Sequence, residues 1–137
     1  MKTSSQRCLA LLLFVTSNAL SAQATDATLL AQGKARFMSD CASCHGASAT
    51  GDGPAAGALR TRPADLTALA RNNSGEYPAE YVKRVVDGRG FQTLAHGNVE
   101  MPVWGSHYGR SLLAYSEQRV QQRIQALVTY LRSIQRK

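Results

Sequence analysis

The sequence predicts an all-α fold, and three observations point to it. Apolar residues near the carboxyl end follow one another at spacings of four, three, four and three, the period of an amphipathic helix: Val120, Ile124, Leu127, Leu131 and Ile134. Two further helical patterns come earlier, one opening near Asp26 and one following Pro78. No stretch of any length alternates apolar and polar residues as a half-buried strand does. A chain of 137 residues, 44% of them hydrophobic, is long enough for one such domain.

Residues 1–24 are predicted to be a secretory signal peptide and not part of that domain. Lys2 and Arg7 precede a short apolar run, and residues 22–24 supply the small-x-small pattern of a cleavage site. The run is too short to span a bilayer, so an uncleaved anchor is the weaker alternative. We therefore expect a mature domain over residues 25–137 that is exported to a periplasm.

Basic residues outnumber acidic ones. The full chain has 16 Lys and Arg against 9 Asp and Glu, and loss of Lys2 and Arg7 with the signal leaves 14 against 9, a net charge of +5. Such a surplus keeps a surface soluble and can steer an acidic protein partner. No basic run is interleaved with aromatic residues, and an exported protein is in the wrong compartment for nucleic acid.

The first mature segment is expected to be a helix that Asp26 or the residue before it caps. Leu30, Phe37 and Cys41 fall near one face of this helix, which indicates that the face packs against another element. Gly33 inside the helix costs about 1 kcal/mol relative to alanine, and such a glycine often marks a close crossing. We expect the last helix to cross here; simple tolerance of glycine on the solvent side is the alternative.

The sequence Cys41-Ala42-Ser43-Cys44-His45 follows this helix directly. Two cysteines separated by two residues and followed by histidine form the attachment signal for c-type haem, because thiols one helical turn apart can reach both vinyl groups on one porphyrin edge. His45 can then bind iron through one ring nitrogen while the other donates to a carbonyl. A redox dithiol would need a βαβ context, and a zinc site would need two more ligands. We predict one covalent haem c, which uses both cysteines of the mature chain and leaves no disulfide.

Residues 46–57 contain four glycines and one proline, so they are expected to form a tight loop that can lie against the porphyrin. Pro54 in this loop offers a carbonyl as a candidate acceptor for the free ring nitrogen of His45. Further along, Asp65 can cap a short helix that runs to about Arg71 before an Asn-Asn-Ser-Gly sequence breaks it.

Pro78 suits a first helical turn, and Gly88 closes the apolar stripe of Tyr81, Val82, Val85 and Val86. Residues 89–100 lack any period and are expected to be a loop that leads into a Met-Pro-Val-Trp-Gly sequence beginning at Met101. Ser116 is the expected cap of the final helix.

A sixth ligand for the iron has four candidates. Met38 lies only a few residues before the attachment motif and cannot reach the opposite face of the porphyrin. Met101 follows the motif's histidine by 56 residues, which is ample chain to wrap around the porphyrin, and the proline after it stiffens its loop. We favour Met101, while His96, His107 and an open coordination site remain alternatives.

The order of these motifs resembles that of class I cytochromes c over nearly all of the mature chain. The match includes Gly-Asp-Gly-Pro at residues 51–54, Pro-Ala-Asp-Leu-Thr at residues 63–67, the Met-Pro-x-Trp-Gly sequence and a final amphipathic helix. The resemblance implies three to five helices wrapped around one haem, with the N- and C-terminal helices crossing. Gly33 and Phe37 would meet Tyr130 at that crossing.

The resemblance also implies roles for single residues. Met101 would be the distal ligand, and the Pro54 carbonyl would accept a hydrogen bond from His45. Trp104 would pack beside the haem and could donate its N–H to a propionate. Weaker candidates to hold the propionates are Arg60 and Arg62.

A haem with protein ligands on both faces has no vacancy for a substrate, so its iron can only change oxidation state. We therefore expect a periplasmic single-haem electron carrier, without catalytic residues, that shuttles one electron from a dehydrogenase or membrane complex to a terminal oxidase or reductase. Its expected partners are redox proteins with acidic docking surfaces, with no nucleic acid, no small-molecule substrate and membrane contact only through partner complexes. Two alternatives are a tightly bound haem c subunit of an oxidoreductase complex and a gas-binding or reactive haem protein with a labile Met101.

Overall fold

The computed structural model describes three stretches of the chain, residues 26–90, 100–110 and 116–136. Regular elements within these stretches are helical and include no strand, which confirms the predicted all-α class. None of their helices is long and apolar enough to cross a membrane. The predicted signal peptide lies outside the described residues. After a first helix over residues 26–40, the elements are α2 (Ala42–His45), the 3₁₀ turns η1 (Ala56–Ala58) and η2 (Arg71–Asn73), α3 (Ala79–Asp87), α4 (Trp104–Gly109) and α5 (Glu117–Ser133).

The first helix crosses α5 closely at Gly33. A Cβ atom on Gly33 would collide with the carbonyl oxygen of Ala126 and lie 2.8 Å from the Cβ of Tyr130, so a larger residue would push the two helices apart. Phe37, one turn later, is fully buried, and its ring centroid lies 5.4 Å from that of Tyr130. The predicted crossing is therefore confirmed. Leu30 differs from the expectation because it is 38% exposed; the helix is mostly exposed before Gly33 and packs only from there on.

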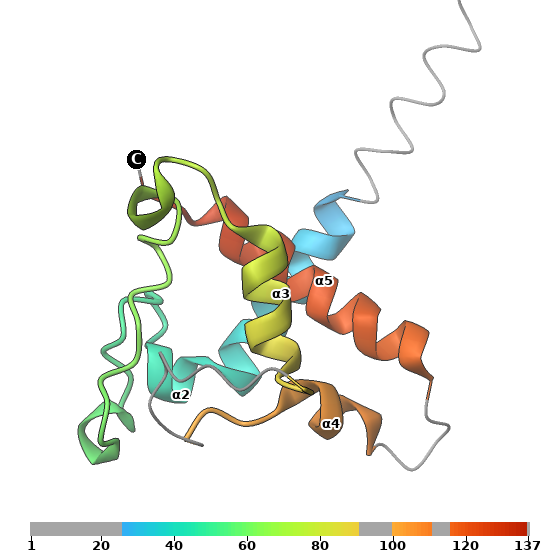
Figure 1. The fold of residues 1–137 in the computed structure, drawn as a ribbon, viewed down its shortest axis with the longest axis horizontal. Helices are drawn as coiled ribbons and strands as arrows, with labels where there is room; N and C mark the ends of the chain where they lie inside the picture. Colours follow the sequence, from blue (N-terminus) through green and yellow to red (C-terminus); the bar gives the residue numbers. More distant parts are fainter. Residues whose placement is uncertain (1–25, 91–99, 111–115, 137) are drawn as a thin grey trace, which may run out of the picture.

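The core forms where α3 and α4 pack on α5 and on each other. Figure 1 shows α3 crossing in front of α5, with α4 below both. Four residues of the predicted apolar stripe, Val120, Ile124, Leu127 and Leu131, are buried on α5. They pack in one core with the buried α3 residues Val82 and Val86, whereas Ile134, just past the end of α5, is only partly buried. Gly88, at φ +69°, ends α3 where the sequence indicated. Ser116 is the N-cap residue of α5, although its side chain makes no capping hydrogen bond.

Residues 46–75 form the wall at the left of Figure 1 and are loop apart from η1 and η2. The prediction of a short helix after Asp65 is wrong. The Asp65 carboxylate accepts from the N–H and the hydroxyl of Thr67 at 2.9 and 2.5 Å, a local turn that competes with helix formation. The N–H of Ala70 donates to the side chain of Gln135 at 2.8 Å and not to a helical carbonyl.

The helix α4 was not expected from the sequence. It has six residues, two of them glycine, which is too short and too glycine-rich for a recognisable helical pattern. Tertiary contacts hold it instead. The hydroxyl of Tyr108 donates to the Asp40 carboxylate at 2.8 Å, next to the attachment motif. A Cβ on Gly105 would collide with the side chains of Asp87 and Arg89, so glycine lets α4 abut the end of α3.

Candidate haem site

Helical hydrogen bonding runs through the attachment motif. The N–H of Cys41 donates to the carbonyl of Phe37, and the N–H of His45 donates to the carbonyl of Cys41, both at 2.9 Å. Cys41 and Cys44 therefore lie one turn apart, and both are free thiols. Gly46 at φ +80° ends α2 directly after His45. This is the spacing that two thioether bonds to one porphyrin edge require.

The loop after α2 folds back onto the motif. The N–H of Gly53 donates to the Cys44 carbonyl at 3.1 Å, and the N–H of Ala55 donates to the Ser43 carbonyl at 2.9 Å. The last carbonyls of a helix have no partner inside it, so these two bonds satisfy groups that the short helix leaves open. A Cβ on Gly53 would lie 2.6 Å from the Cys44 carbonyl oxygen and closer still to that of Ser43. The loop thus packs backbone against backbone on the attachment turn.

The carbonyl partner of His45 is not the predicted one. Its Nδ1 atom lies 3.1 Å from the carbonyl oxygen of Ala64, so Ala64 takes the place that was assigned to Pro54. The hydrogen bonds described above hold the exposed Pro54 loop on the carboxyl end of α2, whereas a bond from Leu66 N–H to the Ala49 carbonyl at 2.8 Å draws the Ala64 segment past the imidazole. A carbonyl can only accept, so Nδ1 carries the proton in this contact, and Nε2 is the ring nitrogen that could bind iron.

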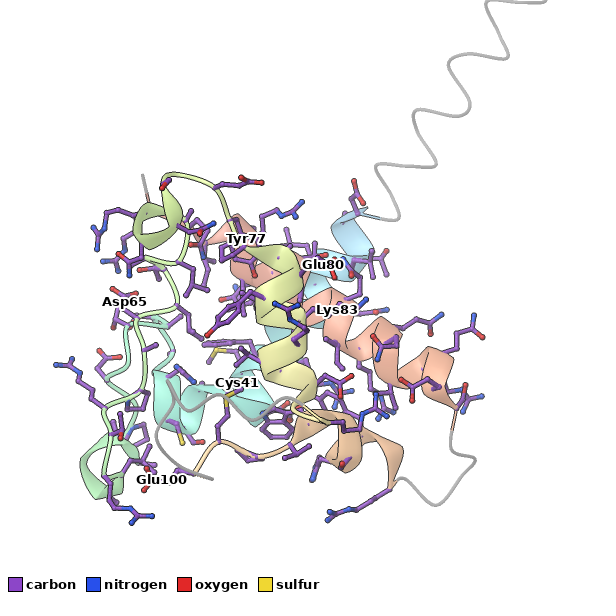
Figure 2. All side chains as sticks on the ribbon, viewed as in Figure 1. Cys41, Asp65, Tyr77, Glu80, Lys83 and Glu100 are labelled. Carbon is purple, nitrogen blue, oxygen red and sulfur yellow. The ribbon has the colours of Figure 1, made fainter. Side chains whose placement is uncertain are left out.

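A cavity of about 170 Å³ opens beside α2. Cys41, Cys44 and His45 line it together with Met101 and Trp104. Much of the remaining lining is aliphatic: Leu59, Leu66, Leu69, Val82, Val85, Val86, Leu127 and Leu131. Figure 2 shows Cys41 beside the lower end of α3, which supplies part of this lining. An apolar slot that carries two thiols, an imidazole and a thioether fits a covalently attached, axially ligated porphyrin.

The cavity distinguishes among the candidates for the sixth ligand. Met38 is 46% exposed on the first helix. His107 is exposed on α4, where its ring centroid lies 5.1 Å from that of Trp104 in an edge-on arrangement. His96 lies outside the described residues. Of the candidates that the structure describes, Met101 alone is among the residues that line the cavity.

The thiol environment does not favour redox chemistry of the cysteine pair itself. Burial, with smaller contributions from Asp40 and Cys44, raises the pKa of the Cys41 thiol to about 12. Redox-active dithiols need a lowered pKa, because the thiolate is the reactive form. Over the described stretches, no group of three His, Cys, Asp or Glu side chains could hold a metal ion, so the zinc alternative gains no support there.

Glu100 fixes the chain just before Met101. One of its carboxylate oxygens accepts from the backbone N–H of Arg60 at 3.0 Å and lies 3.9 Å from the Arg60 guanidinium. In Figure 2 Glu100 lies at the lower left, beside the part of the wall that contains η1. The residue before the predicted ligand is therefore attached to the same loop that covers α2.

Arg89 supports the chain that follows Met101, because Gly105 packs against it. Its guanidinium donates to both carboxylate oxygens of Asp87, at 2.6 and 2.8 Å, and to both of Glu117, at 2.8 and 2.7 Å. Gln121 also donates to each of these carboxylates, at 3.0 and 2.9 Å. The network joins the end of α3 to the start of α5, and Gly105 of the Met-Pro-Val-Trp-Gly sequence packs against it.

Sequence reasoning missed Ala64, Glu100 and Arg89. Glu100 stands next to Met101, but nothing in the sequence shows that its partner is 40 residues earlier. Arg89 follows a helix-ending glycine, and its partner Glu117 is 28 residues further on. Contacts over such separations leave no local signal.

Two of the three residues predicted to contact the haem propionates, Arg62 and Trp104, line the cavity. Arg62 lines the cavity, whereas Arg60 is 76% exposed and paired with Glu100, which makes Arg62 the better candidate. Trp104 is buried at the cavity wall. Its hydrogen bond to a propionate stays a prediction.

An all-α chain that carries Cys-x-x-Cys-His on the wall of an apolar cavity is a haem-binding protein of the c type. The family model for cytochrome c matches residues 30–135, and the chain belongs to the cytochrome c family. It is thus a haem electron-transfer protein whose haem c is covalently attached. Searches of curated proteins and of solved structures gave no match.

Proposed function

We propose that this cytochrome is a periplasmic carrier that moves one electron at a time between a donor dehydrogenase or membrane complex and a terminal oxidase or reductase. The observation that carries the proposal is the shared cavity wall: His45 and Met101 both line it, so the chain itself offers a ligand for each axial position of one iron. With both positions filled by the protein, a substrate has no place to bind at the metal.

The residues around the cavity prepare the ligands for this role. Bound haem supplies a one-electron couple between ferric and ferrous iron. Ala64 holds the Nδ1 proton of His45 and so fixes the ring plane, while the attachments at Glu100 and Gly105 hold the segment that carries Met101. The aliphatic lining excludes water, which disfavours the more highly charged ferric state and raises the reduction potential. Ligands that stay in place in both states keep the reorganisation small.

The location and the partners follow from the chain outside the cavity. Export is supported by the predicted signal peptide over residues 1–24. The surplus of basic residues supports partners with acidic docking surfaces, reached through weak and rapid encounters. Electron-transfer rates with such a partner should fall as ionic strength rises. Rates that ignore ionic strength would contradict this part of the proposal.

Carbon monoxide tests the axial positions. The holoprotein is reduced, and its visible spectrum is recorded before and after the gas is added. An unchanged spectrum is expected, since both positions are occupied by the protein. A rapid shift would contradict the carrier function in favour of a gas-binding or reactive haem, and co-purification with one stoichiometric partner would favour the enzyme-subunit alternative. Met101→Ala should bind the gas, whereas the control Met38→Ala on the exposed side of the first helix should not.

A further inference from the structure

A groove of about 620 Å³ separates the first helix from the amino-terminal half of α5 and shares no lining residue with the haem cavity. Its polar walls are Gln32, Arg36, Ser39, Arg119, Gln122 and Arg123. Three of these side chains are guanidinium groups and none is acidic. The groove therefore presents hydrogen-bond donors and positive charge along its length.

Two of the arginines are held in place by one buried ring. The guanidinium carbons of Arg36 and Arg123 lie 5.5 and 5.7 Å from the ring centroid of Tyr108, which is 5% exposed. The two arginines come from different helices, so the ring fixes cations on both walls. Cation–π contacts of this kind reduce the freedom that a guanidinium would lose on binding an anion.

One arginine of the groove is paired with a carboxylate, and the groove remains positive. Asp40 lies 3.7 Å from Arg36, but the arginine is 38% exposed, and such pairs contribute little. Asp40 also accepts the Tyr108 hydroxyl at 2.8 Å and the hydroxyl of Ser39, a groove residue, at 2.6 Å. Among the described residues, the lining of the groove includes three arginines and no acidic residue, so the local charge favours an acidic ligand even with Asp40 beside it.

The groove ends close to the haem attachment. Ser39 lines it and stands two residues before Cys41. A partner seated in the groove would therefore contact the chain within one helical turn of the first thioether position. Such a partner would lie beside the turn that attaches the haem.

We propose that this groove docks a carboxylate-rich segment of the redox partner. The inference rests on the carrier function and names the surface that the partner contacts. Arg119 and Arg123 stand one turn apart on α5, so they offer two successive positions for carboxylates, and Arg36 and Gln32 face them from the first helix. A row of donors over two helices suits successive side chains of a peptide better than one compact anion.

The test uses the haem-loaded protein and a peptide of eight glutamates at low ionic strength, with binding followed by amide chemical shifts. Peptide binding should shift the amides of the groove residues. Arg119→Glu with Arg123→Glu should weaken binding about tenfold or more, because like charges then face each other across the contact. The matched control, Arg71→Glu with Arg136→Glu, changes the net charge equally on exposed arginines near Asp65 and should change binding less than about twofold. Shifts away from the groove, or an equal loss in both double variants, would overturn the proposal.

Two further measurements separate the possible failures. Vesicles of anionic phospholipid are offered to the same proteins; binding that depends on Arg119 and Arg123 more strongly than peptide binding does would replace the protein partner with a membrane surface. The carbon monoxide spectrum of the Arg119→Glu, Arg123→Glu protein should match that of the wild type. If peptide binding does not depend on Arg119 and Arg123 and carbon monoxide leaves the spectrum unchanged, only the docking site is overturned. If carbon monoxide changes the spectrum of the wild-type protein, the carrier function on which the docking site rests is overturned.

Discussion

The two sides of the haem cavity are built by different means. On the His45 side, α2 and the loop after it are joined by backbone hydrogen bonds between residues that are close in sequence, such as Gly53 to Cys44. On the Met101 side, the ligand's segment is held by side chains from distant elements, through Glu100 with Arg60 and through the Arg89 network. The histidine side is thus specified locally, and the methionine side depends on the assembled fold. We expect changes on the first side to affect haem attachment and changes on the second to affect ligand exchange.

The largest effect is expected at Gly53. Gly53→Ala places a methyl group against the carbonyls of Ser43 and Cys44, where backbone and not a flexible side chain would have to move. Overpacking of this kind costs about 3 kcal/mol, and here it distorts the attachment turn. The yield of covalently loaded protein and its free energy of unfolding should both fall. Gly57→Ala is the control, because no atom lies within 4 Å of its added Cβ, and it should behave like the wild type.

A smaller effect, and of a different kind, is expected at Arg89. Arg89→Ala leaves the carboxylates of Asp87 and Glu117 close together without their shared guanidinium, and the segment that Gly105 anchors loses its support. Haem should still attach. The apparent affinity of the iron for carbon monoxide or imidazole should rise about tenfold. That change corresponds to a bond between Met101 and the iron that is about 1.4 kcal/mol less stable. The control is Arg110→Ala, which changes an exposed arginine at the end of α4. Equal gas binding in both variants would contradict the role given to Arg89.

The pH dependence of stability should reveal one stabilising carboxylate on each side of the cavity. Hydrogen bonds from Arg89 lower the pKa of Asp87 below its ordinary 3.8, and the Thr67 hydroxyl lowers the pKa of Asp65 in the same direction. A depressed folded pKa gives stability that is complete above the ordinary value and is lost as pH falls through the folded value. Arg89→Ala and Thr67→Val should therefore be less stable than the wild type at pH 7, and each difference should shrink below about pH 4. Melting curves from pH 2 to 7 measure this, and a constant difference would count against it.

The smallest effect is expected at Glu100. Glu100→Gln keeps an oxygen for the Arg60 N–H and loses only the charge contact at 3.9 Å with a mostly exposed guanidinium. Exposed pairs are worth less than about 1 kcal/mol. The free energy of unfolding should fall by less than about 1 kcal/mol, and the affinity for carbon monoxide should stay within about twofold of the wild type. Glu100→Ala, which also removes the acceptor, should loosen Met101 more than Glu100→Gln does, and the reverse order would contradict the role given to the backbone bond.

Features that depend on residues close in the sequence could be predicted, and features that depend on distant contacts could not. The attachment motif, the buried stripe of α5 and the crossing at Gly33 are encoded in short spacings, and the structure has the helices where those spacings put them. Pro54 was a reasonable acceptor for His45 on sequence grounds, but choosing between two loop carbonyls depends on how the wall folds, and Ala64 is the one that reaches the ring. The prediction of a short helix after Asp65 was wrong because the Asp65 carboxylate bonds to Thr67 in a local turn and the N–H of Ala70 bonds to the side chain of Gln135. The helix α4 has no local pattern and exists through its contacts with Asp40 and Asp87.

The central claim is that one iron is held between His45 and Met101, and X-ray absorption at the iron edge tests it most directly. The oxidised holoprotein should show five nitrogen scatterers, four from the porphyrin and one from His45, and one sulfur scatterer. The sulfur should vanish in Met101→Ala and persist in Met38→Ala. An iron without sulfur in the wild-type protein, or a sulfur signal that survives Met101→Ala, would contradict the account.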